Sequence, residues 1–203
     1  IGSGDREKPL REYVNAYGVS NYFFMLKDVP SDSTWLSTDM GSCGSTICLN
    51  AMFNITGSSD PAASDLANKK GWYLSLNTHE QVVTSAITVF GGTTFSTHTP
   101  TVPDPDACAS DLGTARVYNL RYNNAAPTKP NATSRYEEIS GGGLPPSPVA
   151  GQVKVPNPDN PDEEIIVPFI IGADASSPLE GGLPVAPSLS TLPKSITYWY
   201  IEK

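Results

Sequence analysis

Apolar and polar residues alternate with a period of two along much of this 203-residue chain, in segments rich in aromatic and β-branched residues. Clusters of Gly, Pro, Asn and Asp separate these segments, which is the pattern of short β-strands joined by turns. The pattern predicts strands over residues 22–27, 71–76, 81–90, 93–97, 115–122, 147–155, 164–171 and 196–202. The chain is therefore expected to be all-β, with antiparallel sheets and little helix.

Helix signals are few. The stretch "REYVNAYGVS" predicts a turn or two of helix. The stretch "DPAASDLANKKG" predicts a short helix capped by Asp60, with Pro61 as its first residue and Gly71 just past its end. Without long amphipathic helices to cross between parallel strands, a βαβ fold is disfavoured, and a propeller, barrel or sandwich is favoured.

Long polar stretches separate the predicted strands, at residues 29–45, 100–113, 123–140 and 156–162. Loops of about ten or more residues are uncommon in compact domains unless they carry function. We expect them to decorate the faces of the β scaffold. The stretch "GGGLPPSPVAGQV" begins too rich in Gly and Pro for a central strand, so only its end, from Val149 to Val155, is expected to pair.

The charge of the chain argues against two classes of partner. It carries 21 acidic and 13 basic residues, for a net charge of -8, which repels nucleic acid and anionic lipid. Charged residues make up 17% of the chain, below the average of about 25%, as suits secreted β-rich proteins. No apolar run reaches the roughly 18 residues of a membrane-spanning helix.

The three cysteines leave two alternatives open. Cys43 and Cys48 lie five residues apart in "GSCGSTIC", where the flanking Gly and Ser residues allow a tight loop closed by a disulfide. The other alternative is three unpaired thiols, with Cys108 alone in either case. A cysteine nucleophile is less favoured than a disulfide, because no third group is evident that would orient a histidine.

The only two histidines, His79 and His98, lie in the stretch "GWYLSLNTHEQVVTSAITVFGGTTFSTHTP". A zinc site needs three or more ligands, and no HxH, HExxH or Cys-His cluster supplies them. The acidic turns at residues 104–106 and 159–162 lack the spacing of a calcium loop. We therefore predict no catalytic, cofactor-binding or metal-binding residue, and interpret the histidines as polar residues near strand ends.

The opening stretch "GSGDREKPL" places Asp5 and Arg6 just after a tight Gly-Ser-Gly bend. We expect this pair to lock a loop through charge-assisted hydrogen bonds, a structural role rather than a catalytic one. A bend of this kind usually follows a strand, and none precedes it here. The chain is therefore expected to be a fragment of a longer polypeptide.

Several stretches together resemble a known family. "GSGDREKPL", "NYFFMLKD", the histidine-containing stretch above, "DACASDLGTARVYNLRY" and "GGGLPPSPV" follow the order seen in the C-terminal β-propeller of the PilY/PilC family of type IV pilus tip-associated proteins. The resemblance runs from Ile1 to about Val155, and the closing "ITYWYIEK" is similar to that family's last aromatic strand. It implies that residues 1–203 are the C-terminal part of a β-propeller domain.

The resemblance also implies a function without catalysis. It implies a protein at the pilus tip or cell surface of a Gram-negative bacterium, which supports pilus assembly and adhesion and contacts minor pilins, other envelope proteins or the N-terminal remainder of its own chain. An alternative is a structural subunit whose incomplete propeller is completed by a partner chain. Some family members carry a calcium loop, but no such loop lies in residues 1–203, so calcium binding is expected only in upstream sequence. No other cofactor is expected.

Overall fold

The structure is a computed structural model that describes residues 1–37, 43, 44, 46–57, 60–89, 91–102, 106, 112–129 and 132–173. Its strands are β1 (Tyr22–Leu26), β2 (Phe53–Asn54), β3 (Gly71–Ser75), β4 (Gln81–Val82), β5 (Ile87–Val89), β6 (Gly92–Thr99), β7 (Thr114–Arg121), β8 (Tyr136–Ile139), β9 (Val149–Asn157) and β10 (Asn160–Ile171). Its helical elements are α1 (Val14–Tyr17), α2 (Ala63–Ala67) and a 3-10 turn at Leu49–Ala51. The prediction of a mostly antiparallel β protein with little helix is confirmed, and no helix among these residues is long and apolar enough to cross a membrane.

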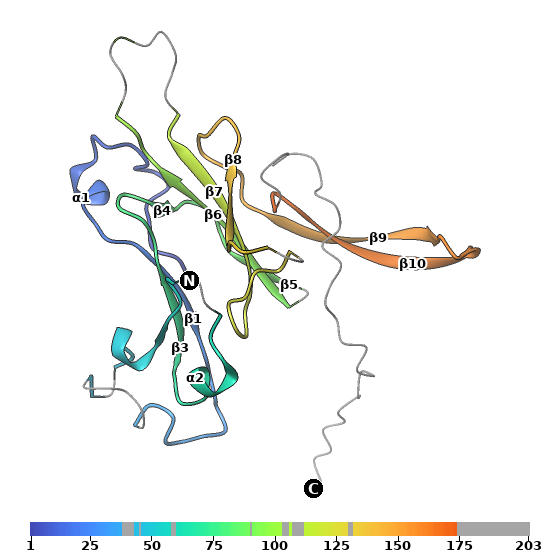
Figure 1. The fold of residues 1–203 in the computed structure, drawn as a ribbon, viewed down its shortest axis with the longest axis horizontal. Helices are drawn as coiled ribbons and strands as arrows, with labels where there is room; N and C mark the ends of the chain where they lie inside the picture. Colours follow the sequence, from blue (N-terminus) through green and yellow to red (C-terminus); the bar gives the residue numbers. More distant parts are fainter. Residues whose placement is uncertain are drawn as a thin grey trace, which may run out of the picture.

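Strands β6 and β7 form the centre of the largest sheet (Figure 1). They pair antiparallel over their whole length, from Gly92 opposite Arg121 to Thr99 opposite Thr114. Strand β8 pairs with the far edge of β7, and both β4 and β5 pair with the free edge of β6. Strands β5 and β6 are joined by a short connection, with Val89 opposite Gly92, and Gly91 has φ 82°, in the left-handed region that glycine occupies without strain.

The single strand predicted over residues 81–90 is divided in two, and this is a correction to the sequence pattern. Between β4 and β5 the hydroxyl of Thr84 accepts a hydrogen bond from the Ser96 amide at 2.7 Å and donates to the Ser96 carbonyl at 3.4 Å. The Ser96 carbonyl also accepts from the Val83 amide at 3.1 Å, so the Thr84 side chain replaces only the carbonyl that would otherwise accept from the Ser96 amide. The edge strand bends there without leaving these groups unpaired.

The second sheet has β3 at its centre, antiparallel to β1 and parallel to β2. Residues 1–3 join this sheet to the first one. The Phe24 amide donates to the Ile1 carbonyl at 2.7 Å, and on the other side the Val82 amide donates to the Ser3 carbonyl at 3.0 Å. The N-terminal segment therefore lies as a seam between β1 and β4 (Figure 1).

The core between the sheets is a column of aromatic rings. The rings of Phe23 and Phe95 stack with centroids 3.8 Å apart, and Phe95 stacks on Tyr118 at 4.8 Å. Trp72 is fully buried beside them, and its indole nitrogen donates to the Tyr122 carbonyl at 2.9 Å. Because each stacked ring comes from a different strand, the column fixes β1, β6 and β7 relative to one another.

The helix predicted after Asp60 is present, but its first residue and its cap differ from the prediction. Helix α2 begins at Ala63 rather than at Pro61, and the carboxylate of Asp65 accepts a hydrogen bond from the Ala62 amide at 2.8 Å. Asp60 does not cap it, and instead pairs with Arg135 at 3.0 Å. The other predicted helix is a single turn, α1.

Two strands lie where none was predicted. Strand β2 has two residues, too few for any period, and β8 falls within the predicted loop at 123–140. The predicted strands at 147–155 and 164–171 are present and form a long hairpin, β9 and β10, that stands away from the sheets (Figure 1). The predicted strand over residues 196–202 lies outside the described residues.

Candidate functional site

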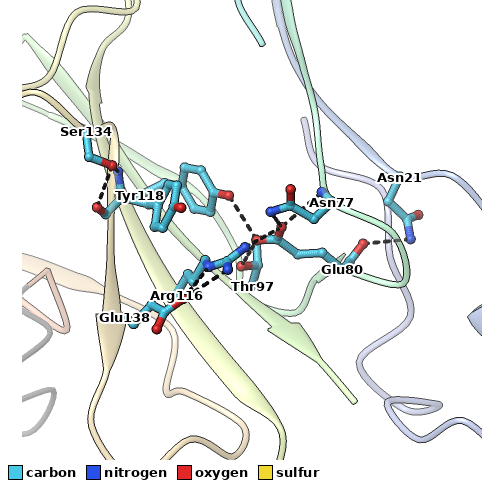
Figure 2. Close-up of polar contacts among 9 residues, drawn as sticks. Asn21, Asn77, Glu80, Thr97, Arg116, Tyr118, Ser134 and Glu138 are labelled. Atoms are coloured by element: carbon cyan, nitrogen blue, oxygen red, sulfur yellow. Dashed lines mark hydrogen bonds and ion pairs between the residues drawn. The ribbon is translucent and has the colours of Figure 1, made fainter. Parts of the chain in front are cut away.

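The most densely bonded polar group of the described chain is the carboxylate of Glu80, which lies in the turn between β3 and β4 and has no solvent exposure. Its Oε1 accepts hydrogen bonds from the Thr97 hydroxyl at 2.6 Å and the Tyr118 hydroxyl at 2.9 Å. Its Oε2 accepts from the Asn77 amide at 3.0 Å, the Asn77 side chain at 2.7 Å and the Arg116 guanidinium at 3.1 Å. Figure 2 shows these donors converging on the carboxylate.

Strand register brings these donors together. Thr97 lies directly opposite Arg116 in the pairing of β6 with β7, and Phe95 lies opposite Tyr118. Side chains two residues apart on a strand share a face, so Arg116 and Tyr118 project on the side of the sheet that holds the aromatic column. A cation at this position requires a buried acid, and the β3–β4 turn supplies it as Glu80.

Arg116 bridges two carboxylates of different exposure. Besides Glu80, it donates two hydrogen bonds to Glu138 on β8, from Nε at 3.2 Å and Nη2 at 3.0 Å. The Glu138 side chain is 59% exposed, and the guanidinium also lies 4.6 Å over the Tyr136 ring. One arginine therefore connects the interior of the sheet with its outer strand.

Burial and the neighbouring carboxylates together set the protonation of Tyr118 and Arg116. Burial raises the pKa of Tyr118 above its ordinary value, and the neighbouring negative charge of Glu80 and its hydrogen bond raise it further. For Arg116, burial disfavours the charged form, but the hydrogen bonds that it donates to Glu138 and the negative charge of Glu80 outweigh this effect and raise its pKa. The site therefore holds a neutral phenol and a guanidinium cation around one carboxylate.

This arrangement acts as a clasp. Five donors occupy the two carboxylate oxygens, so an incoming ligand must displace one of them. The Glu80 carbonyl also accepts from Asn21 at 3.1 Å, which ties the same turn to the residue preceding β1. The geometry serves to hold the β3–β4 turn against β6 and β7, and to stabilise the junction of the two sheets.

Sequence reasoning did not find Glu80 or Arg116, although one signal was present. In "TARVYNLRY", Arg116 shares a face with Tyr118 and Leu120 by the period of two. An arginine among core-facing residues predicts a buried acidic partner, because an unpaired buried charge is too costly. Glu80 itself has no periodic signal, since it lies in a turn.

The predicted disulfide is present and joins Cys43 to Cys48, whose Cα atoms are 6.2 Å apart. It closes a small loop just before the 3-10 turn at Leu49–Ala51. Cys108 lies outside the described residues.

The structure places Asp5 and Arg6 with different partners. The Arg6 guanidinium donates to the Val83 carbonyl at 2.6 Å and the Pro145 carbonyl at 3.0 Å. Asp5 accepts from the Glu7 amide at 3.1 Å, and its own amide donates to the Gln81 side chain at 2.9 Å. The charge-assisted bonds of Arg6 thus lead to backbone carbonyls of two distant segments rather than to its neighbour, because a guanidinium on an extended side chain reaches across the loop.

The two histidines bond to different segments. His79, at φ 64° in the β3–β4 turn, stacks on the Tyr17 ring with centroids 3.6 Å apart and has Nδ1 2.8 Å from the Tyr17 carbonyl. His98 is buried near the end of β6, with Nε2 2.8 Å from the Leu112 carbonyl. A carbonyl only accepts, so each of these ring nitrogens carries a proton. Within the described ranges, no three His, Cys, Asp or Glu residues are grouped so as to hold a metal ion.

Two hollows lie beside residues 3–12 of the N-terminal segment. An open groove of about 750 Å³ runs between α1 and residues 3–5. A smaller hollow of about 400 Å³ is lined mainly by apolar side chains, among them Leu10, Leu112 and Leu144, with His98 as part of its wall. Neither one reaches the Glu80 carboxylate, whose contacts are all internal.

Comparison with known proteins gives one structural likeness. No protein-family model and no curated protein matches the chain. The structure is similar to the crystal structure of the Pseudomonas aeruginosa PilY1 C-terminal domain, with 10% sequence identity and a TM-score of 0.36. The match covers 74% of this chain and 35% of that one. Identity and overlap at this level leave the family and the function of the chain as proposals.

Proposed function

We propose that this chain is a non-enzymatic module of a type IV pilus tip-associated protein of the PilY/PilC kind, part of a β-propeller, that supports pilus assembly and surface attachment. The observation that carries the proposal is the order of the stretches "GSGDREKPL", "NYFFMLKD", "GWYLSLNTHEQVVTSAITVFGGTTFSTHTP", "DACASDLGTARVYNLRY" and "GGGLPPSPV" along one chain. On this proposal its partners are minor pilins or other envelope proteins, and it acts at the cell surface or pilus tip.

The body of the structure suits a binding module. The aromatic column and the Glu80 clasp join the two sheets, and the described part of the segment after β1, residues 30–37, is largely exposed. The segment that follows β1 is held in place at Trp35. The ammonium of Lys70 lies 3.7 Å over the Trp35 ring and donates to the Trp35 carbonyl at 2.5 Å. A disulfide within a loop also suits an oxidising compartment outside the cytosol.

Deletion of the gene in its native host tests this function. We expect loss of surface pili or of attachment, counted by electron microscopy and a surface-adhesion assay, with an unchanged growth rate in liquid medium. Complementation with the wild-type gene should restore both properties. Normal piliation together with normal attachment in the deletion strain would contradict the proposal.

A second candidate function is that of a structural subunit whose sheet is completed by another polypeptide. The observation that favours it is the hairpin of β9 and β10, which pairs with itself and stands away from the two sheets (Figure 1). Strands with open edges accept further strands. A purified chain whose solution mass is that of a well-folded monomer, with the hairpin unchanged by any partner, would weaken this candidate.

A further inference from the structure

The hairpin of β9 and β10, called the ribbon below, has one apolar face. The register pairs on that face are Val155 with Ile165, Val153 with Val167, Gly151 with Phe169 and Val149 with Ile171. None of these eight residues is buried, and Val149 and Val153 are 58% and 46% exposed. An apolar row of this length usually packs against a core, and here every member of the row remains partly or largely exposed.

The ribbon is fixed at its base and open beyond it. Ile170 and Ala173 are buried at the base, and the Asn119 side chain donates to the Ala173 carbonyl at 2.7 Å. Further out, Phe169 lies over Gly151, where a Cβ atom would come within 2.5 Å of the ring. The apolar face is therefore ordered by contacts within the ribbon before any partner arrives.

A two-stranded ribbon is only marginally stable in water, whereas three strands with an apolar face are stable. The two outer edges differ in what they offer a third strand. Pro168 lies in the middle of β10 and has no backbone N–H, so it interrupts that strand's donors. Strand β9 has its one proline, Pro156, near the tip and none from Val149 to Val155, so its edge keeps its donors over that stretch.

The charge of the ribbon indicates the kind of strand that fits. Its outer end carries four exposed carboxylates, those of Asp159, Asp162, Glu163 and Glu164. The only basic residue of the ribbon is Lys154, which pairs with Glu164 at 3.3 Å. An incoming strand is favoured when its own basic residues lie beside this acidic end, and a second copy of the same acidic ribbon is disfavoured.

We propose that the β9 edge of the ribbon binds an extended segment of another protein, one with alternating apolar side chains and basic residues at the end that lies beside residues 159–164. The segment adds a third, antiparallel strand and continues the apolar face formed by Val153 and Val167. This inference deepens the second candidate function, because it names the surface and the chemistry of the completing strand.

The probe is a synthetic peptide that matches β9 in length, with two N-terminal lysines followed by alternating valine and threonine. We expect it to bind the full 203-residue chain in titration calorimetry and to slow hydrogen exchange of the Gln152 and Lys154 amides. A matched peptide with glutamates in place of the lysines should bind about tenfold more weakly, and this difference should vanish at about 1 M salt. Equal binding of the two peptides at low salt would overturn the charge assignment.

Two peptides methylated on alternate backbone nitrogens test strand addition without altering the protein. In an added strand, one set of amides faces β9 and the other faces solvent, so only one methylated peptide should lose binding. If both methylated peptides lost binding, or if neither did, strand addition would be overturned.

The matched protein variants are Gln152→Pro, which removes an edge donor from β9, and Gln152→Thr, which keeps it. We expect binding to fall at least about tenfold in the first variant only, with the nuclear Overhauser contacts between Val153 and Val167 unchanged in both. Protection of the Gln152 amide in the free chain before peptide is added would overturn the proposal, since another part of the chain or a second copy would then occupy the edge. These measurements use purified chain alone, so a deletion strain with normal pili leaves their outcome unaffected.

Discussion

The Tyr118 hydroxyl donates a 2.9 Å hydrogen bond to a Glu80 carboxylate that has no contact with solvent. The same ring stacks on Phe95, with centroids 4.8 Å apart. One residue thus takes part in both the polar clasp and the aromatic column. The stability of the sheet junction is therefore expected to depend on Tyr118 in two separable ways.

Replacement of Tyr118 by Phe keeps the stacked ring and removes only the hydroxyl. We expect the free energy of unfolding to fall by about 1.5–3 kcal/mol, the range for a hydrogen bond to a charged group. Urea unfolding measures the change. Tyr136→Phe is the control, since that ring lies at the half-exposed surface, and it should shift stability by less than about 0.5 kcal/mol.

The stability of the protein is expected to fall in alkaline solution because of Tyr118. Its pKa is raised in the folded state from the ordinary value of 10.0, so the unfolded chain releases this proton at lower pH than the folded chain does. The contribution is fully present below pH 10.0 and is lost as the pH rises above it. Urea midpoints measured on both sides of pH 10.0 should show this loss in the wild type and a smaller loss in Tyr118→Phe. Identical pH profiles for the two proteins would contradict it.

The Glu80 and Arg116 pair is expected to show strong coupling in a double-mutant cycle. Arg116→Met leaves a buried carboxylate without its cation, and Glu80→Gln removes the charge that the guanidinium faces, so each single variant should cost about 3–5 kcal/mol. The double variant should cost clearly less than the sum of the two.

A control for this cycle uses the exposed partner of the same arginine. Glu138→Gln, at a side chain 59% exposed, should change the free energy of unfolding by less than about 1 kcal/mol. The buried ion pair would not be the centre of the clasp if the losses of unfolding free energy in the Glu80 and Arg116 variants were additive. The same would follow if the Glu138 variant lost as much as the Glu80 variant.

Arg6 is expected to matter for stability through the two carbonyls that it joins. Arg6→Met keeps most of the side-chain length but removes the donors to Val83 and Pro145, so we expect a loss of about 1.5–3 kcal/mol in thermal or urea unfolding. Arg11→Met, at a nearby exposed arginine, is the matched control and should have little effect. A wild-type melting curve for Arg6→Met would rule out the locking role.

Alternation of apolar and polar residues was sufficient to locate most strands, because strand formation is largely a local matter of side-chain period and turn chemistry. Strand β8 escaped this reasoning, since "YEEI" places two glutamates in four residues and belongs to an outer strand of the sheet. The sequence pattern could not predict the clasp, because Glu80 and Arg116 are 36 residues apart and only the register of three strands brings them together.

The ribbon shows a different limit of sequence reasoning. The segment "IIVPFII" in β10 has nearly the composition of a fully buried strand, yet Ile166 within it is 59% exposed. Apolar composition indicates that a strand needs a covering surface, and it does not say whether the same chain supplies that surface.

The seam formed by residues 1–3 has a consequence for the order in which the protein folds. Their partner Val82 lies about eighty residues later in the chain, and β6 must pair with β4 to hold that partner in place. Contacts so distant in sequence form late, because the intervening chain must first be ordered. The opening residues are therefore expected to pair with β1 first, and to bond to Val82 only when the centre of the larger sheet has formed.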